Sequence, residues 1–502
     1  MSANDVGVNG RRWAGWVPAL ALGLLALVLR SWFFLRFDEA YFDSDQAIVG
    51  LMAKHITEGR AWPLFFYGQE YMLAVEAWVM APVFLLLGPT VFSLHLTMVL
   101  INAAAGGLLV YLLVRDARLS PMQGLVATLP FWVAPVVLSA HLIEAQGGNP
   151  EPFLWVCVLW LVRSRPLLLG ALAATAFLHR EFSIYAVPAL FLISLLERPD
   201  RASLTRHWLT AVFAGIVVFG AWQSLKPYAD IMGPGTAGMA VPDRPQDNIT
   251  QLVHRMELDQ SALPRRFAAL VTDLFPLLLG VNTQLPTVFA IGSDVRVGWA
   301  ELALPLAVAS VVLLGFVAWR PGQRGAYPGA WAFPLFLILI GVQAAVAYAI
   351  TRDPSVYLLR YALLALLLPI GVIALQLQPW RPFGVRVFAT FVVVVLAGAS
   401  AMDHARVIQH SYRRSAPLRF ADVAARLAER GVTTGRAGYW RAYAIAFLTR
   451  EKVRLTSTEV LRIQEYEDLA NRAEPHVVTL QEQPCGPGTR QDAVGVWFIC
   501  GP

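Results

Sequence analysis

Charged residues are scarce in this sequence. Only 15% of the 502 residues are Asp, Glu, Lys or Arg, whereas 57% are hydrophobic. Soluble domains carry roughly 25% charged residues, so this composition excludes a soluble globular protein. The chain also lacks internal repeats and low-complexity tracts. It therefore gives no support to a solenoid or to a transporter built from inverted repeats.

The apolar residues gather in runs long enough to cross a bilayer as helices. Clear examples are residues 299–319, 331–350 and 385–402. About 20 apolar residues span roughly 30 Å of hydrocarbon as a helix. The first run, 13–35, follows Arg11 and Arg12 like a secretory signal, but it is long and has no small-residue cleavage site. It is interpreted as a retained first span.

The net charge of +6 is distributed in a way that indicates topology. The arginines lie in pairs at the ends of apolar runs, which is typical of cytoplasmic loops rather than of a nucleic-acid surface. Placing these pairs inside predicts an N-terminus in the cytoplasm and a C-terminal tail outside. The expected membrane is the cytoplasmic (inner) membrane of a bacterium. About eleven spans follow, at roughly 13–35, 93–114, 122–140, 150–163, 167–179, 181–197, 208–226, 299–319, 330–351, 356–378 and 384–402. The stretch from Tyr71 to Leu87 is interpreted as an interfacial or re-entrant helix.

Two parts are expected. Residues 1–402 form an all-α polytopic membrane domain with a first external loop at 36–92 and a second large external loop at 227–298. Residues 403–502 form a small α/β domain outside the membrane, because a helix-like 418–430 stopped by Gly431 precedes short apolar runs. In that domain Cys485 and Cys500 either form a disulfide or are both free, since an external compartment is oxidising. Cys157, within a span, is a core residue.

Acidic residues crowd the start of the first external loop. Asp38, Glu39, Asp43 and Asp45 lie within eight positions directly after a span, and an amphipathic helix from Ala47 to Ile56 follows. One interpretation is a solvated edge loop. The other is an active site, because a surface helix would hold these carboxylates at the level where a lipid-linked donor presents its phosphate.

Transfer of a sugar from a polyprenyl phosphate needs a base for the acceptor hydroxyl and positive groups for the departing phosphate. Asp45 is the first candidate base, Asp43 the second and Asp38 a further alternative. The Asp43-x-Asp45 spacing also permits a divalent metal ion, although two carboxylates are few ligands.

The first loop resembles that of GT-C membrane glycosyltransferases. The resemblance rests on Asp45-Gln46-Ala47, then Gly50, Gly59 and Pro63, and on the run from Phe66 to Tyr71. It is greatest to the superfamily of protein O-mannosyltransferases and lipid A aminoarabinose transferases, whose loop carries an Asp-Glu pair at the start of an interfacial helix. Here Gln46 replaces that Glu, and Gly68-Gln69-Glu70-Tyr71 stands where the superfamily has a lysine-proline-proline feature.

Further polar residues on the predicted outer side are candidates for binding substrate. The loop 141–151 carries Gly147-Gly148 and is interpreted either as an ordinary turn or as the wall of a sugar or acceptor pocket. Arg180 interrupts a long apolar stretch, and it either pairs with Glu181 or faces the donor phosphate. The candidates from these segments and from the first loop are Lys54, His55, Tyr67, Gln69, Glu144, Asn149, Glu151 and Arg180.

The segment that opens the tenth predicted span carries three more candidates, Arg352, Arg360 and Tyr361. Arg360 lies about one turn into the membrane, where it either meets an anion such as phosphate or extends to the interface. An Arg-Tyr pair at this helix start also resembles the GT-C superfamily. In the tail, Tyr439, Trp440, Tyr443 and Phe447 are interpreted as aromatic core or as a sugar-stacking surface.

The leading hypothesis is an inverting glycosyltransferase that moves a sugar from a polyprenyl-phosphate carrier to a glycan, lipid or protein acceptor at the extracytoplasmic face. The alternatives are a lipid or solute transporter or flippase, and a glycan polymerase or ligase. The charges cluster at the outer edge of the spans rather than in their middle, which favours the transferase over the transporter. No cofactor beyond an optional metal ion and no nucleic-acid partner is expected.

Overall fold

The computed structural model describes residues 15–37, 41–197, 200–241, 261–282, 297–318, 329–350, 356–413, 420–475, 477–487 and 489–501. Two candidates from the sequence, Asp38 and Arg352, lie outside these residues. Residues 242–260 and 283–296 of the second predicted loop also lie outside them.

Long apolar helices form the body of the molecule. Within the described residues, seven helical segments are long and apolar enough to cross a membrane. They are α2 (Trp16–Arg36), α5 (Val91–Asp116), α11 (Arg201–Ser224) with η3 (Lys226–Tyr228), η5 (Ala300–Leu302) with α15 (Ala303–Ala318), α16 (Ala332–Ala349), η7 (Val356–Leu366) with α17 (Leu367–Leu377), and α18 (Phe383–Arg413). The last predicted span therefore continues eleven residues beyond its expected end at 402.

Shorter helices complete the bundle. They are α6 (Pro121–Trp132), α7 (Val136–Ile143), α8 (Glu151–Val162), α9 (Pro166–His179), η2 (Glu181–Tyr185), α10 (Ala186–Glu197), α13 (Leu263–Ala269), η4 (Leu270–Leu274) and α14 (Phe275–Leu278). Helices α6 and α7 are long and apolar enough to cross a membrane only together, and they are bent by 87° at the break between them. Each of the eleven predicted spans falls on a helical segment.

Local signals in the sequence explain several helix starts. Thr90 and Ser93 form a reciprocal capping box before α5, and Ser120 and Gln123 do the same before α6. Asp200 caps α11 by accepting from the amides of its first turn. Each cap satisfies amides that have no partner within the helix.

Glycine allows the closest helix contacts. A Cβ on Gly170 of α9 would lie 1.9 Å from the Ala211 carbonyl oxygen of α11, and one on Gly341 of α16 would lie 2.4 Å from the Leu368 amide nitrogen of α17. Small residues bring membrane helices together because lipid tails provide no hydrophobic drive for side chains to associate.

The first predicted loop folds as α3 (Ser44–Thr57), a hairpin of β1 (Phe65–Phe66) and β2 (Gln69–Leu73), and α4 (Val75–Leu87). The predicted helix at Tyr71–Leu87 is wrong in its first residues, which belong to β2. Helix α4 has 13 residues. At 1.5 Å per residue it is about 20 Å long, shorter than the roughly 30 Å of hydrocarbon.

A small α/β unit ends the chain. It contains α19 (Ala421–Glu429), β3 (Thr434–Ala437), α20 (Tyr439–Leu448), β4 (Arg454–Ser457), α21 (Gln464–Ala473), β5 (Val478–Gln481), β6 (Gln491–Val494) and β7 (Trp497–Cys500). The strand order is β4-β3-β5-β7-β6, with β3 parallel to β4 and β5, and β7 antiparallel to β5 and β6. Cys485 and Cys500 form a disulfide with their Cα atoms 5.6 Å apart, whereas Cys157 is a buried free thiol.

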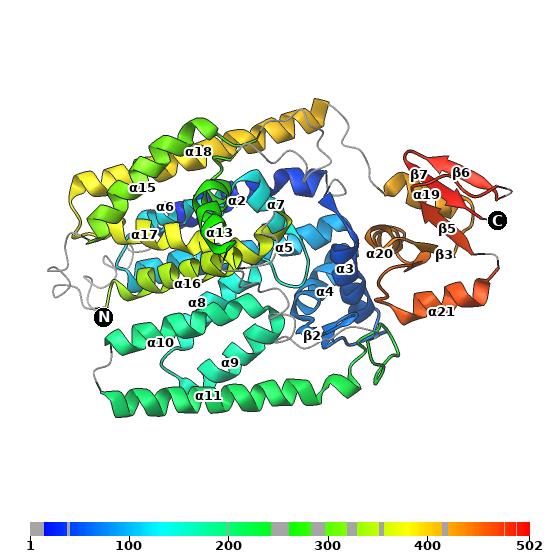
Figure 1. The fold of residues 1–502 in the computed structure, drawn as a ribbon, viewed down its shortest axis with the longest axis horizontal. Coiled ribbons are helices and arrows are strands. Elements are labelled where there is room, and N and C mark those ends of the chain that lie inside the picture. Colours follow the sequence, from blue (N-terminus) through cyan, green and yellow to red (C-terminus); the bar gives the residue numbers. More distant parts are fainter. Residues whose placement is uncertain are drawn as a thin grey trace, which may run out of the picture.

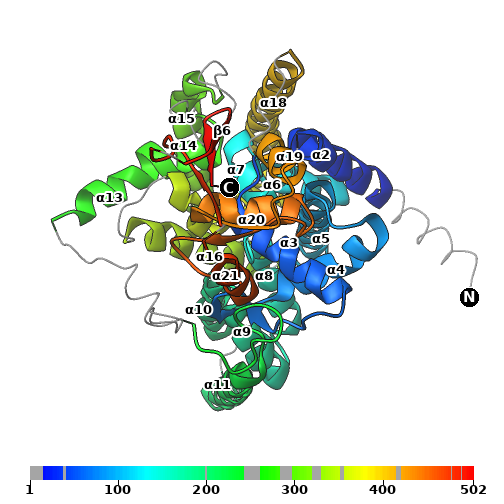
Figure 2. The same ribbon diagram turned by 90° about the vertical axis from the view of Figure 1, so that its right-hand side faces the viewer.

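The α/β unit sits at one end of the helical bundle, beside the first-loop elements (Figure 1). There α20 lies against α3, and a single apolar cluster joins α3, α4 and the C-terminal sheet. Figure 2, which faces this end, shows α20 beside α3. The core of the bundle is a separate cluster formed mainly by helices α2, α5 to α8, α10, η7 and α16 to α18.

Candidate functional site

Asp43 and Asp45 lie at the first turn of α3, at the end of the bundle that the α/β unit covers. Asp43 is the N-cap residue, and its Oδ1 accepts from the Gln46 amide at 3.1 Å. Asp45 stands two residues later and accepts from the Tyr439 hydroxyl at 2.5 Å. Acidic residues are favoured here because they satisfy free amides and complement the helix dipole.

Glu144, at the end of α7, is held by three donors. Its carboxylate accepts from the Tyr41 hydroxyl, from His141 Nδ1 at 2.9 Å and from Asn149 Nδ2 at 3.1 Å. Asn149 also donates to the His141 carbonyl at 2.9 Å, which closes the loop 144–149 on itself. Glu144 is only 4% exposed, so its carboxylate is held by these donors rather than by water.

Arg360 joins these acidic groups from η7. Its Nη1 donates to Gln146 Oε1 at 2.5 Å, and Gln146 Nε2 reaches Asp43 Oδ2 at 3.4 Å. The Arg360 charge is attracted to the carboxylates of Asp45 and Glu144. Arg360 also donates to the Tyr361 hydroxyl at 3.2 Å. Three segments far apart in the sequence thus bring one guanidinium and three carboxylates together.

The carboxylates in this group have different acidities. Burial raises the pKa of Asp43 to about 7, and the negative charges of Asp45 and Glu144 add to the rise. Burial also opposes ionisation of Glu144, but His141, Tyr41 and Arg360 outweigh it and hold the pKa of Glu144 below its ordinary value. Neighbouring carboxylates whose pKa values are driven apart are typical of acid-base sites.

The α/β unit contributes two side chains to the same place. One is Tyr439, and both burial and the charge of Asp45 raise its pKa well above the ordinary value. The other is Arg462, which extends from the segment before α21. Its Nη1 donates to the Gly68 carbonyl at 2.9 Å, and Gln69, with its amide oxygen facing the guanidinium, accepts from Nη2 at 2.9 Å. The candidate Gln69 is therefore connected to Asp45 only through Arg462 and Tyr439 of the α/β unit.

Three other candidates are engaged elsewhere. Lys54 Nζ contacts Glu451 at 2.5 Å, and His55 lies between the Tyr67 hydroxyl and Glu451, 3.1 Å from each. Lys54 is nine residues after Asp45, about 13 Å along the helix. The structure brings Lys54, His55 and Tyr67 together with each other and the α/β unit, but not with the carboxylate group around Asp45.

A second buried charged group contains the candidates Glu151 and Arg180. Glu76 of α4 accepts from the Gly147 amide, and its carboxylate is repelled by the charge of Glu151 and attracted by that of Arg180. Arg180 contacts Met72 Sδ at 3.4 Å and the Phe182 ring. Among the described residues, neither oxygen of Glu151 has a hydrogen-bond partner.

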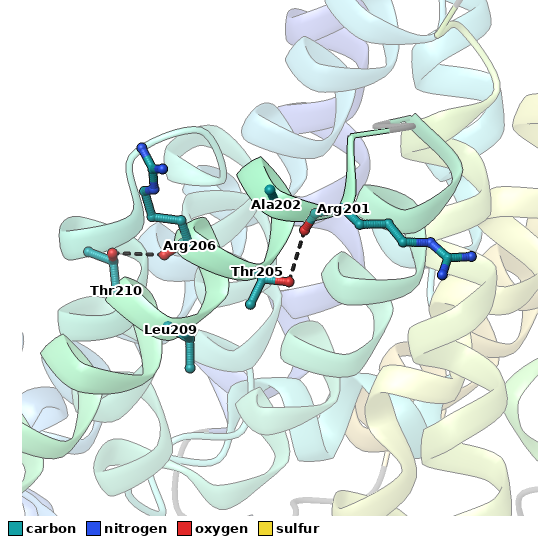
Figure 3. Close-up of a pocket in the computed structure, with 6 residues that line it drawn as sticks. All are labelled: Arg201, Ala202, Thr205, Arg206, Leu209 and Thr210. Carbon is teal, nitrogen blue, oxygen red and sulfur yellow. Dashed lines mark hydrogen bonds between the residues drawn. The ribbon is translucent and has the colours of Figure 1, made fainter.

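Within the described ranges, no group of three or more His, Cys, Asp or Glu side chains is placed to hold a metal ion. A hollow of about 600 Å³ lies on α11 and is lined by Arg201, Ala202, Thr205, Arg206, Leu209 and Thr210. Figure 3 shows its threonine hydroxyls bonded to carbonyls of the same helix and its two arginines pointing apart. None of the sequence candidates lines it.

Sequence reasoning missed several residues of the group. Gln146 and Tyr41 lie in the candidate loops 141–151 and 36–92, but nothing in their spacing indicates that they bridge charges. The sequence predicts Tyr439 only as aromatic core or a stacking surface, and no motif in the sequence singles out Arg462. No signal links residues about 400 positions apart when only one sequence is considered.

No protein-family model and no curated protein matches the sequence. Solved structures do match its fold, and two of them are of the same protein. The crystal structure of ArnT from Cupriavidus metallidurans bound to undecaprenyl phosphate has a TM-score of 0.58 and 12% identity, covering 97% of this chain and 98% of that chain. The apo structure of the same protein has a TM-score of 0.57 at the same identity and coverage. The resemblance of the first loop to GT-C proteins thus correctly predicted the fold. The chain is a polytopic integral membrane protein with the GT-C fold and a small C-terminal sheet domain.

Proposed function

We propose that the protein is an inverting membrane glycosyltransferase that moves a sugar from a polyprenyl-phosphate carrier to an acceptor hydroxyl. One observation carries this proposal. A carboxylate, Asp45, has one oxygen held by Tyr439 and lies near the guanidinium of Arg360, in a chain with the fold of ArnT.

The reaction follows from these groups. Asp45 Oδ2 has no hydrogen-bond donor among the described residues, so it can accept the proton of an acceptor hydroxyl. The hydroxyl oxygen then attacks C1 of the sugar, the bond between C1 and the phosphate oxygen breaks, and the configuration at C1 inverts. The polyprenyl phosphate leaves with its negative charge, which Arg360 attracts. Asp43, Glu144 and Gln146 orient Arg360 and the loop around it.

The proposed setting is the extracytoplasmic face of a bacterial inner membrane, with the N-terminus inside and the α/β unit outside. The paired arginines of the sequence support this orientation. A donor whose phosphate lies at the interface would then meet the first turn of α3. The proposed partners are a polyprenyl-phosphate-linked sugar, a glycan, lipid or protein acceptor, and membrane lipid.

The test is transfer of labelled sugar by the purified full-length protein from synthetic polyprenyl-phosphate donors. Asp45→Asn should lose activity by about 100-fold or more, because general-base catalysis contributes roughly 10² to 10⁴. Asp43→Asn should lose less activity than Asp45→Asn, since asparagine also caps a helix but has only one oxygen to accept from Gln46 and Gln146. If Asp45→Asn keeps full activity while Asp38→Asn or Asp43→Asn is inactive, Asp45 is not the base.

The same preparation separates the other hypotheses. A chelator that abolishes transfer would make Asp43 and Asp45 metal ligands. If no donor supports turnover but a lipid or solute crosses a sealed vesicle that contains the protein, the chain is a transporter rather than a transferase.

A further inference from the structure

Tyr439 stands at the point where the α/β unit meets the candidate base. It is the first residue of α20, is 6% exposed, and donates its hydroxyl to Asp45 Oδ1 at 2.5 Å. Its ring packs edge-on against Trp440 and Tyr443, with centroids 5.3 and 5.9 Å away. The hydroxyl therefore has little freedom, and it fixes one of the two oxygens of Asp45.

Arg462 packs on the ring of Tyr439. Its guanidinium lies over the Tyr439 ring, 5.6 Å from the centroid, and its charge attracts both the Tyr439 oxygen and Asp45. The hairpin of the first loop locks this arginine in place through Gly68 and Gln69. Gly68 has φ +68°, and a Cβ there would lie 2.7 Å from Arg462 Cδ, so a larger residue would displace the guanidinium.

The interface around this pair has a fixed register. Ser44 Oγ accepts from the Ala444 amide at 3.3 Å, one turn beyond Tyr439. Gly50 of α3 lies against the Phe447 ring. Farther along α3, Lys54 and His55 contact Glu451. Because these contacts follow α3 from its first to its last turn, α20 cannot slide without moving Tyr439 away from Asp45.

We propose that Tyr439 and Arg462 of the α/β unit are positioning residues for Asp45, so that this unit completes the transfer site instead of standing apart from it. The proposal rests on the proposed function and adds to it. A carboxylate held by one oxygen presents the other in a single orientation. Without the tyrosine hydroxyl it would sample several rotamers, and fewer encounters would place its free oxygen within reach of the acceptor proton.

The experiment compares Tyr439→Phe with Tyr466→Phe in the full-length protein. Both changes remove one buried hydroxyl that donates to a carboxylate, to Asp45 in the first case and to Glu451 at 2.9 Å in the second. For Tyr439→Phe, kcat should fall about 100-fold with the donor KM unchanged, because a small misplacement of a catalytic group costs about this factor. Tyr466→Phe should keep the kcat of the wild type.

Two outcomes would overturn the proposal. In the first, Tyr439→Phe retains at least half of the wild-type kcat while Asp45→Asn is inactive. In the second, both tyrosine variants lose activity equally with a similar rise in KM, which would mean that Tyr439 only stabilises the interface.

Amide hydrogen exchange separates failure of this proposal from failure of the proposed function. If the wild type transfers no sugar from any polyprenyl-phosphate donor, the function is wrong, but positioning can still be measured at residues 44–50. Faster exchange there in Tyr439→Phe than in Tyr466→Phe would support positioning of the Asp45 turn. Equal exchange in the two variants would overturn it.

Discussion

At the residue scale, the roles of the charged side chains near α3 depend more on the residues they contact than on their positions in the sequence. Asp43 and Asp45 are two residues apart, yet one caps a helix and contacts Gln146 while the other binds Tyr439. Arg360 faces the acidic group, whereas Lys54 is neutralised by Glu451 and Glu58. The local sequence predicts neither distinction.

Asp43 should make stability depend on pH. Its folded-state pKa is about 7 against an ordinary value of 3.8, so the folded protein favours the protonated form. Its contribution to stability is complete below about pH 4 and is lost as the pH rises through about 7. Asp43→Asn should remove this loss. Thermal unfolding of both proteins in detergent between pH 4 and 8 measures it, and parallel curves would contradict the prediction.

At the element scale, the bend between α6 and α7 has an identifiable support. Pro135 has no amide hydrogen, so the Phe131 carbonyl lacks the donor that a continuous helix would provide. Arg30 of α2 donates to that carbonyl and, at 2.6 Å, to Asn102 Oδ1. An arginine that is 1% exposed in a membrane helix thus completes the hydrogen bonding of a neighbouring broken span.

Arg30→Met should destabilise the bundle. The change leaves the Phe131 carbonyl and the Asn102 amide oxygen buried without this donor, at a cost of about 2 kcal/mol. Thermal unfolding in detergent measures the effect, with Arg206→Met on α11, whose arginine borders the open hollow of Figure 3, as a matched control. Equal melting temperatures for the two variants would show that the bend does not depend on Arg30.

The crossing of α3 and α20 depends on a glycine. A Cβ on Gly50 would lie 2.5 Å from Phe447 Cε2 and 2.9 Å from Cδ2, which is too close for a buried ring. Gly50→Ala should therefore lower the free energy of unfolding by about 1 to 3 kcal/mol through overpacking.

Phe447→Leu should recover part of that loss when it is combined with Gly50→Ala, because the smaller side chain makes room for the methyl group. A double-mutant cycle measures the coupling between the two positions. Strictly additive losses would mean that the ring moves aside without strain.

At the scale of the whole molecule, one buried carboxylate joins the first loop to the α/β unit. Glu451 accepts from Lys54, His55, Arg60 and Tyr466, with distances from 2.5 to 3.1 Å. Burial alone would raise its pKa, but His55 and Lys54 outweigh burial and lower the pKa below its ordinary value. The stability it supplies is therefore present above about pH 4.5 and is lost as the pH falls further.

Glu451→Gln should destabilise the interface by about 3 kcal/mol, since it leaves Lys54 and Arg60 without a buried counter-charge. The measurement is thermal unfolding of the full-length protein, followed by sugar transfer at a temperature where both proteins stay folded. Glu429→Gln is the control, because its partner pair with Arg426 is exposed and should contribute little. A loss no larger than that of the control would show that Glu451 is not the main link.

The sequence by itself determined the membrane class and the helical segments of the membrane part. These follow from composition and local periodicity, which act over a few residues. It also located the acidic first turn of α3, because that turn directly follows a span. It did not determine which residues meet there.

Only the tertiary structure decided that Tyr439 and Arg462 lie beside Asp45, that Lys54 and His55 face Glu451 instead, and that Arg360 reaches the acidic group through Gln146. These partners are brought together by the packing of α20 on α3 and of η7 on the bundle. Contacts across 200 to 400 residues depend on how whole elements pack, and no local pattern records that packing.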